Sequence, residues 1–325
     1  MDVLSDILRI LKFNTSVYFR TRLRAPWWVT IPERPSVVRF HIVIAGRCWG
    51  TVPGLTEAIA LGPGDVFVVP RGQGHEFYSD AGAPRQPLET LLAQADFDGM
   101  TLSFGGRGPQ TQLLCGHFEF DEGVSHPMLS SFPGHFSLSP TAETGLGWLA
   151  TLLQLIERES KVSRPGAATA LNRLTEVLFI QVLRAFMADP RNETSFMIGL
   201  RDRFVGEALR RLHRRPGHAW TVDELAHEVG LSRTALSLRF VKIIGLAPAQ
   251  YLTRWRMQLA RTALLGSKKS LALIGEELGY RSEAAFNRVF KRHFGVGPGR
   301  YRRLQAPASL EPGPPMARDA RRHAG

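Results

Sequence analysis

The sequence predicts an α+β chain with several domains, and the distribution of residue types along it gives three reasons. Residues 1–140 are rich in Gly, Pro, Val and Phe in short runs separated by turn signals, which is typical of a β-barrel. Residues 141–199 repeat apolar residues every three to four positions, which indicates a helical linker. Residues 200–305 are predicted to form an all-α domain that contains one pattern twice, and the Pro-, Ala- and Arg-rich residues 306–325 are expected to form a disordered tail.

Within the first domain we expect one helix followed by strands. The opening MDVLSDILRILKF spaces Leu and Ile as an amphipathic helix does, and its interspersed acidic residues are unlike a secretory leader. Strands are expected at VVRFHIVIAG (37–46), DVFVVP (65–70) and CGHFEF (115–120). No apolar run reaches the ~18 residues that cross a bilayer, so we expect a cytoplasmic protein with no membrane partner.

Two linker helices are expected, at about residues 144–161 and 166–188. Pro165 stands at the start of the second, where its missing N–H has no cost, and Asp189-Pro190 ends it. This second helix is more apolar than a solvated spacer needs. The sequence leaves open whether its apolar face packs on the barrel or on a second subunit of a dimer.

The positive charge is concentrated in one segment. The chain carries a net charge of +12 with His neutral, and residues 201–305 hold 21 Lys and Arg against 8 Asp and Glu, while the rest of the chain is close to neutral. Concentrated positive charge predicts a polyanionic partner, because neutralising phosphates releases counterions. Two cysteines are too few for a disulfide scaffold or a zinc finger.

The basic segment contains the same pattern twice. ELAHEVGLSRTALSLRF (224–240) aligns with LIGEELGYRSEAAFNRVF (273–290), with an offset of 49 up to the central glycine and 50 after it. Each copy predicts a helix-turn-helix: a small residue lets two helices approach, a glycine ends the first helix, and a serine caps the second. The residues in these roles are Ala226, Gly230 and Ser232 in the first copy and Gly275, Gly279 and Ser282 in the second.

Aromatic and leucine residues complete each unit. Leu236 with Phe240, and Phe286 with Phe290, share one helical face and are expected to anchor the second helix to the core. Thr221, followed by acidic residues, is the expected N-cap of the first helix. GLAPAQYLTRWRMQLARTALL (245–265) predicts one long connecting helix that fixes the spacing of the two units.

Residues 201–303 resemble the DNA-binding domain of the AraC/XylS family of transcription regulators. The resemblance rests on LAHEVGLSRTALSLRF, on the connecting helix and on GYRSEAAFNRVFKRHFGVGPGRYRR. It implies that each unit puts its second helix into successive major grooves about 34 Å apart. The positions that it assigns to base reading are Arg233, Thr234 and Ser237 in the first unit and Glu283, Ala284, Asn287 and Arg288 in the second. Those that it assigns to phosphate contact are Lys242, Lys291, Arg292 and Arg302.

A second resemblance concerns the first domain. GDVFVVPRGQGHEFYS (64–79) resembles the second cupin motif, with Gly64, Pro70, Gly72 and His75 in place and Ser79 where that family has Asn. FHIVIAGRCW resembles the strand and turn of the first motif. The resemblance implies that His75 points into the barrel. The His pair that completes the metal site of cupin enzymes is missing from TIPERPSVVRF.

Four further groups are candidates for the barrel interior: His41, Cys48, Cys115 and His117. With His75 they could line an effector pocket, or they could sit satisfied in the core. His41, His75, Cys115 and His117 could also hold a soft divalent metal ion. Cys48 and Cys115 could pair on oxidation if their Cα atoms lie within about 7 Å. The sequence leaves these alternatives open.

Together the resemblances imply a sequence-specific transcription regulator, more often an activator in this family, controlled by a small-molecule effector in the barrel. The expected partners are double-stranded DNA, the effector, a second copy of the chain in a homodimer, and RNA polymerase; no cofactor is required, although a divalent metal in the barrel is the alternative. A cupin metalloenzyme with a helical appendage is the rival interpretation, and an architectural DNA binder without sequence preference is a second.

Overall fold

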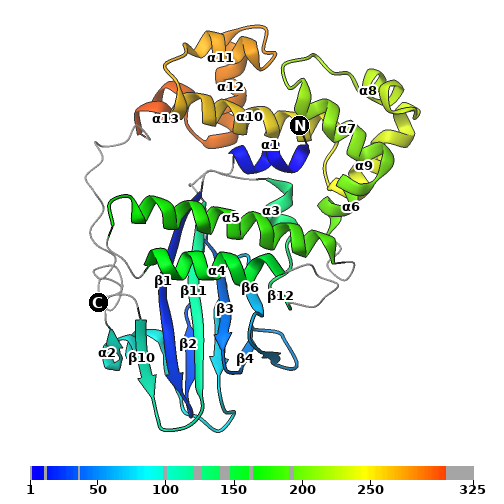
Figure 1. The fold of residues 1–325 in the computed structure, drawn as a ribbon. Coiled ribbons are helices and arrows are strands. Elements are labelled where there is room, and N and C mark those ends of the chain that lie inside the picture. The colour runs from blue at the N-terminus through cyan, green and yellow to red at the C-terminus, as the bar shows by residue number, and fades with distance from the viewer. Residues whose placement is uncertain are drawn as a thin grey trace. The chain divides into compact units, whose positions relative to one another are not determined.

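The structure, a computed structural model, describes residues 2–10, 13–35, 37–97, 101–120, 126–139, 147–160, 164–189 and 194–304. They form two compact units (Figure 1). The sheet unit takes its described residues from 13–120 and 132–189. The helical unit takes its own from 2–10, 126–131 and 194–304. The predicted domains follow the order of the chain, whereas these units interleave along it, and the predicted tail lies outside the described residues.

Hydrogen bonding arranges the strands of the sheet unit in two sheets instead of one closed barrel. The larger sheet, ordered β12-β6-β3-β11-β1-β10-β9, comprises β1 (Phe13–Arg24), β3 (Val37–Ala45), β6 (Val66–Val69), β9 (Asp96–Phe97), β10 (Thr101–Gly105), β11 (Gln110–Phe120) and β12 (Phe136–Leu138). The smaller sheet, ordered β5-β4-β7-β2-β8, comprises β2 (Trp28–Ile31), β4 (Cys48–Thr51), β5 (Ile59–Leu61), β7 (His75–Tyr78) and β8 (Arg85–Pro87). The strands expected at 37–46, 65–70 and 115–120 are therefore present.

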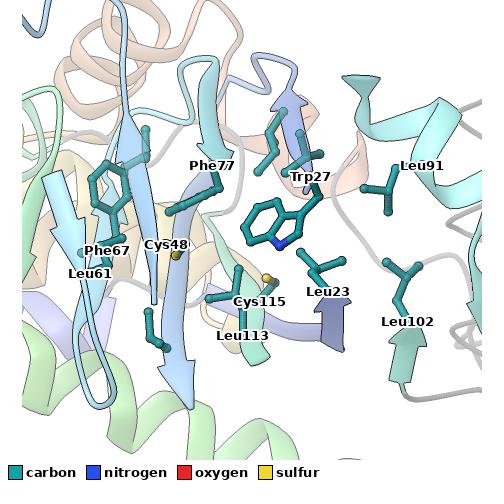
Figure 2. Packing of buried hydrophobic residues seen from close by; sticks show 14 of the residues in the cluster. Leu23, Trp27, Cys48, Leu61, Phe67, Phe77, Leu91, Leu102, Leu113 and Cys115 are labelled. Carbon is teal, nitrogen blue, oxygen red and sulfur yellow. The ribbon is translucent and has the colours of Figure 1, made fainter. Parts of the chain in front are cut away.

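The core of this unit lies between the two sheets. Phe67 and Leu113 come from the larger sheet and Phe77 from the smaller, and Trp27 is buried just before β2 (Figure 2). On β7 buried and half-buried residues alternate, as the period-two pattern of a half-buried strand requires, whereas all four residues of β6 are buried. The predicted sheet-rich N-terminal fold is confirmed, with the difference that it is built as two facing sheets.

Helices cover the outer face of the larger sheet. α4 (Gly147–Ser160) and α5 (Ala167–Ala188) lie side by side against it (Figure 1). The third described helix of this unit, α2 (Leu88–Gln94), contacts β2, β8 and β10 instead and adds Leu91 to the core. The ring centroids of Phe179 on α5 and Phe118 on β11 are 4.6 Å apart. α4 and α5 confirm the two predicted linker helices, and the apolar face of α5 packs on the sheet.

The helical unit is formed by ten helices among the described residues. They are α1 (Val3–Ile10), α3 (Pro127–Ser131), α6 (Ser195–Arg201), α7 (Arg203–Arg214), α8 (Val222–Val229), α9 (Arg233–Ile244), α10 (Pro248–Gly266), α11 (Leu271–Glu277), α12 (Glu283–Phe294) and α13 (Pro298–Leu304). The pair α8–α9 is the first predicted helix-turn-helix, α11–α12 is the second, and α10 is the expected connecting helix.

The caps of these helices form as the sequence predicts. The hydroxyls of Thr221, Ser232 and Ser282 accept hydrogen bonds from the backbone N–H three residues on, which satisfies donors that a helix start leaves unpaired. Gly230 and Gly279 have φ of 76° and 80°, in the left-handed region that a side chain disfavours. The turn of each unit is therefore set by residues that the repeat has in common.

One arginine of α10 holds the two helix-turn-helix units together. Arg256 Nε donates to the carbonyl oxygen of Pro216 at 2.7 Å, and its Nη2 donates to that of His218 at 2.8 Å. This holds the loop between α7 and α8 against α10 and against the turn of the second unit, where Gly217 and Gly279 approach backbone to backbone. The guanidinium of Arg256 is therefore used in contacts within the protein.

A buried chain of hydrogen bonds connects three segments that lie far apart in the sequence. The Met128 N–H donates to His126 Nδ1 at 3.1 Å, so the proton of this imidazole is on Nε2, which lies 3.2 Å from Tyr251 Oη. Tyr251 then donates to His213 Nε2 at 2.7 Å. The remaining nitrogen of His213 faces Asp6 Oδ2 of α1 at 3.8 Å. Helix α1 and residues 126–131 are thereby joined to α7 and α10.

The two turn glycines give a matched pair of substitutions. Gly230→Ala meets open space and is expected to destabilise the helical unit by only about 1–2 kcal/mol, the strain of a left-handed alanine. Gly279→Ala carries the same strain, and its Cβ would also overlap the Gly217 carbonyl oxygen. Urea unfolding of both variants should therefore show a clearly larger loss for Gly279→Ala. Equal losses of unfolding free energy in the two variants would contradict the close approach of the backbones at Gly217 and Gly279.

Candidate nucleic-acid interface and sheet-unit interior

The two predicted reading helices are built alike. α9 and α12 each have 12 residues, a serine N-cap and a glycine C-cap with positive φ, at Gly245 and Gly295. Leu236, Phe240, Phe286 and Phe290 are fully buried, as the repeat predicts. The offset of 50 therefore relates equivalent positions in space as well as in sequence.

The outward faces of these helices hold most of the predicted DNA-contacting residues. The side chains that are exposed are Arg233, Thr234, Lys242, Glu283, Ala284, Arg288, Lys291 and Arg292. Those that are only half exposed are Ser237, Asn287 and Arg302. With 100° per residue, Arg288 points directly away from the buried Phe286 and Phe290, whereas Asn287 lies at the flank of the helix beside the core.

Leu238 occupies the same place in the first unit that Arg288 occupies in the second. It lies two residues before Phe240, as Arg288 lies two residues before Phe290, and it is 69% exposed. Leu238 is not among the residues that the family resemblance assigns to base reading. The offset of 50, applied to Arg288, is the signal that identifies it.

Some predicted contacts are already made inside the protein. Arg302 donates from Nε to the Leu264 carbonyl oxygen at 3.2 Å and from Nη2 to that of Lys269 at 2.6 Å. Arg233 Nη1 lies 3.1 Å from Asp223 Oδ2 in an exposed ion pair. Such exposed pairs contribute little to stability, so Arg233 can exchange this partner, while Arg302 is tied to two carbonyls.

A depression beside α12 gathers cations at the end of the second unit. Asn287, Arg288, Lys291 and Arg300 line it together with the backbone of Gly297–Gly299. Asn287 Oδ1 is buried there without a hydrogen-bond partner. An amide oxygen only accepts, as phosphate oxygens do, so a contact of Asn287 with the DNA backbone would have to use its amide NH2 group.

In the sheet unit, three of the candidate interior residues form one chain of hydrogen bonds. His75 Nδ1 donates to the Gln73 carbonyl oxygen at 3.0 Å, so His75 Nε2 accepts, and it lies 2.8 Å from His41 Nε2. His41 must therefore carry its proton on Nε2, and its Nδ1 accepts from the Cys115 thiol at 3.2 Å. His75 points into the interior, as the motif implies, and each proton in this chain has one place.

Burial keeps these groups neutral. Burial lowers the pKa of His75 to about 4, although the hydrogen bond to Gln73 opposes this shift. Burial also lowers the pKa of His41 well below its usual range, and the neighbouring His75 adds to that shift. Burial also raises the pKa of the Cys48 and Cys115 thiols to about 12. The two thiols are therefore protonated, and neither is a reactive thiolate.

The remaining candidates lie near this chain without joining it. Cys48 is on β4, in the same apolar cluster as Cys115 (Figure 2). His117 is buried two residues beyond Cys115 on β11, with its Nε2 3.8 Å from Glu119 Oε2, and burial lowers its pKa to about 4. Of the five candidate residues from the sequence, Cys115, His41 and His75 are hydrogen-bonded to one another, and Cys48 and His117 lie nearby.

The trio does not fit a metal ion. Cys115 and His75 contact opposite edges of the His41 ring, so one ion cannot meet all three. Over the part of the chain that the structure describes, no three His, Cys, Asp or Glu side chains converge as a metal site. The four metal ligands considered from the sequence, His41, His75, Cys115 and His117, are thus held by hydrogen bonds and packing.

Two models of known families match this chain. A family model described as cupin matches residues 2–188, and one described as helix-turn-helix domain matches residues 225–304. No helix within the described residues has the length and apolar character to span a bilayer.

Two relatives align with this chain over nearly their whole length. A Streptomyces antibioticus protein named as an AraC-like transcription regulator is 33% identical over 94% of this chain and 100% of its own length. A Streptomyces lividans protein of the same description is 32% identical over 93% and 98%. Among solved structures, the DNA-binding domain of AdpA in complex with a target DNA is 28% identical, covers 32% of this chain and 92% of its own, and has a TM-score of 0.31.

The neutral histidines predict how stability depends on pH. Unfolded His75 binds a proton near pH 6.5, whereas folded His75 does so only near pH 4, so the unfolded state holds more protons between these values. Stability is therefore present above about pH 6.5 and is lost as the pH falls through this window, by at most about 1.4 kcal/mol per pH unit for one group.

We expect His75→Asn to make this slope shallower in urea titrations from about pH 7 to about pH 4. His227→Asn, which changes an exposed residue of α8, is the matched control and should leave the slope as it is. An unchanged slope in His75→Asn would show that His75 is not held neutral in the folded state.

Proposed function

The chain belongs to the AraC-like transcription regulators, with an N-terminal cupin domain and a C-terminal DNA-binding helix-turn-helix domain, and we propose that α9 and α12 read two successive major grooves of its operator. The observation that carries this is the pair of similarly built helices whose anchored faces are buried, whose opposite faces are exposed, and which both carry exposed cations. The rival interpretation as a metalloenzyme has no support among the relatives, which are named as regulators.

In this proposal the base-reading residues lie at the centre of each outward face. Arg288 makes a bidentate contact with guanine, and Ala284 and Thr234 lie one turn before the central position of their helices. Ser237, Arg233, Glu283 and Asn287 lie nearer the flanks and the helix starts, where they contact bases at the edge of the site or the backbone. Exposure and position on the helix support these roles.

Phosphate contacts surround the reading faces. Lys242, Lys291 and Arg292 are exposed at the ends of α9 and α12, where a cation meets the DNA backbone and adds affinity without reading sequence. Arg302 contributes by holding the start of the second unit through the Leu264 and Lys269 carbonyls, and not by direct contact.

We further propose that a small-molecule effector binds in the cupin domain and shifts the regulator towards an activating arrangement. The polar trio Cys115–His41–His75 lies in an otherwise apolar interior, with Cys48 and His117 beside it. Its four ring nitrogens are all hydrogen-bonded, so a polar effector atom binds here by replacing one of these bonds. The effector acts by binding one arrangement more tightly than the other. No resident cofactor is needed, and the protein acts in the cytoplasm, where its DNA lies.

Assembly as a homodimer is the third part of the proposal, and contact with RNA polymerase at the promoter follows from an activating role. Leu155 on α4 and Val177 on α5 are 45% and 44% exposed, on helices whose other faces pack on the sheet. Large apolar side chains exposed on adjacent helices favour association through these helices.

Arg288→Ala tests the reading role. It should weaken binding to a selected operator by roughly 1–3 kcal/mol and relax the preference at one base pair, because a bidentate contact with guanine is lost. Arg210→Ala is the control, since Arg210 is an equally cationic exposed residue paired with Glu207 on α7. Titration of fluorescent duplexes measures both. An equal loss on every sequence would make Arg288 a phosphate contact.

The oligomeric state tests the assembly. Sedimentation of the wild-type chain should show a dimer, and the double substitution Leu155→Lys with Val177→Lys should shift it to the monomer because two like charges are placed in the interface. Thr90→Lys, on the exposed face of α2, should leave the dimer intact. A wild-type monomer would refute this part of the proposal.

A further inference from the structure

The first reading helix carries an exposed apolar strip. Leu238 is 69% exposed and Val241 is 45% exposed, and they lie three residues apart on the outward face of α9. Thr234 adds a methyl group one turn earlier on the same face. Apolar surface left in water is stabilised when a partner covers it, so this strip needs a partner outside the helical unit.

The internal repeat identifies which position this is. Leu238 corresponds to Arg288, Val241 to Lys291 and Thr234 to Ala284 at the offset of 50 that also relates the caps and the buried anchors. The two reading helices therefore present the same backbone to DNA with opposite chemistry at the centre. One has a guanidinium there, and the other has a branched alkyl group.

The surroundings of the strip favour DNA as its partner. Arg233 at the start of α9 and Lys242 near its end are both exposed, so the apolar strip lies between two cations in the most basic segment of the chain. The apolar group that the major groove presents is the C5 methyl of thymine. A leucine at the centre of the face fits that methyl and offers no hydrogen bond to guanine or cytosine.

We propose that Leu238 reads a thymine methyl group in the half-site bound by the first unit, with Val241 packing beside it. The inference rests on the proposed function, and it adds that the two half-sites differ: thymine opposite Leu238 and guanine opposite Arg288. Because the two half-sites differ, each DNA-binding domain can bind its pair of half-sites in one orientation only.

The test removes the methyl from the DNA as well as the side chain from the protein. Duplexes selected by the full-length protein from a randomised library define the operator, and each thymine is then replaced singly by deoxyuridine. At one thymine of the first half-site, wild-type binding should weaken about fourfold, the worth of one buried methyl group. Leu238→Ala should bind the thymine operator several-fold more weakly and should no longer distinguish thymine from uracil there.

Two further variants separate the explanations. Leu273→Ala removes another exposed leucine, 41% exposed on α11, and should keep the full sensitivity to uracil. Leu238→Arg makes the first reading helix resemble the second, and repeated selection should then replace that thymine by guanine.

Selective binding with no sensitivity to any uracil would overturn the inference and leave the proposed function standing. Dissociation of the oligomer by Leu238→Ala, with DNA sequence preference unchanged, would also overturn it and assign the strip to a protein partner. Failure to recover any preferred duplex would refute the proposed function itself.

Discussion

The spacing of the two reading helices depends on one half-buried contact network around Arg256. A long connecting helix alone would leave each helix-turn-helix free to rotate about its end. The guanidinium prevents this because it satisfies two carbonyl oxygens of the loop that precedes the first unit, while the glycines at 217 and 279 let that loop touch the turn of the second. Two grooves on one face of DNA can be read together only if the readers are held in this way.

The local features of the helical unit could be predicted because short-range chemistry determines them. A serine oxygen three residues from an N–H, a glycine with positive φ, and aromatic anchors one turn apart leave a pattern in the sequence. The role of Arg256 leaves no such pattern in the sequence. Its carbonyl partners are about 40 residues away, and the sequence does not show which basic residue of α10 would bind them. Leu238 is a different case, because only the offset of 50 from Arg288 identifies it and its own residue type does not mark it as a DNA contact.

The interior of the cupin domain shows the same limit. The motif predicts the inward direction of His75, and composition brings forward His41 and Cys115, but the order in which they connect depends on strand pairing. The Gln73 backbone carbonyl lies at the end of this hydrogen-bond chain, and it fixes the position of every proton because it can only accept. The same logic fixes the His126–Tyr251–His213 chain, where the Met128 amide can only donate.

In the sequence, α1 and residues 126–131 of the helical unit adjoin the strand pair β1–β11 of the sheet unit. Phe13 pairs with Phe120 at one end of that ladder, α1 ends three residues before Phe13, and His126 follows six residues after Phe120. Both segments that pack in the helical unit therefore continue from the same end of one antiparallel pair. β11 of that pair also carries Cys115 and His117. A C-terminal fragment without α1 and residues 126–131 would leave Tyr251 and His213 without these partners, so the DNA-binding unit is complete only when the chain of the cupin domain supplies them.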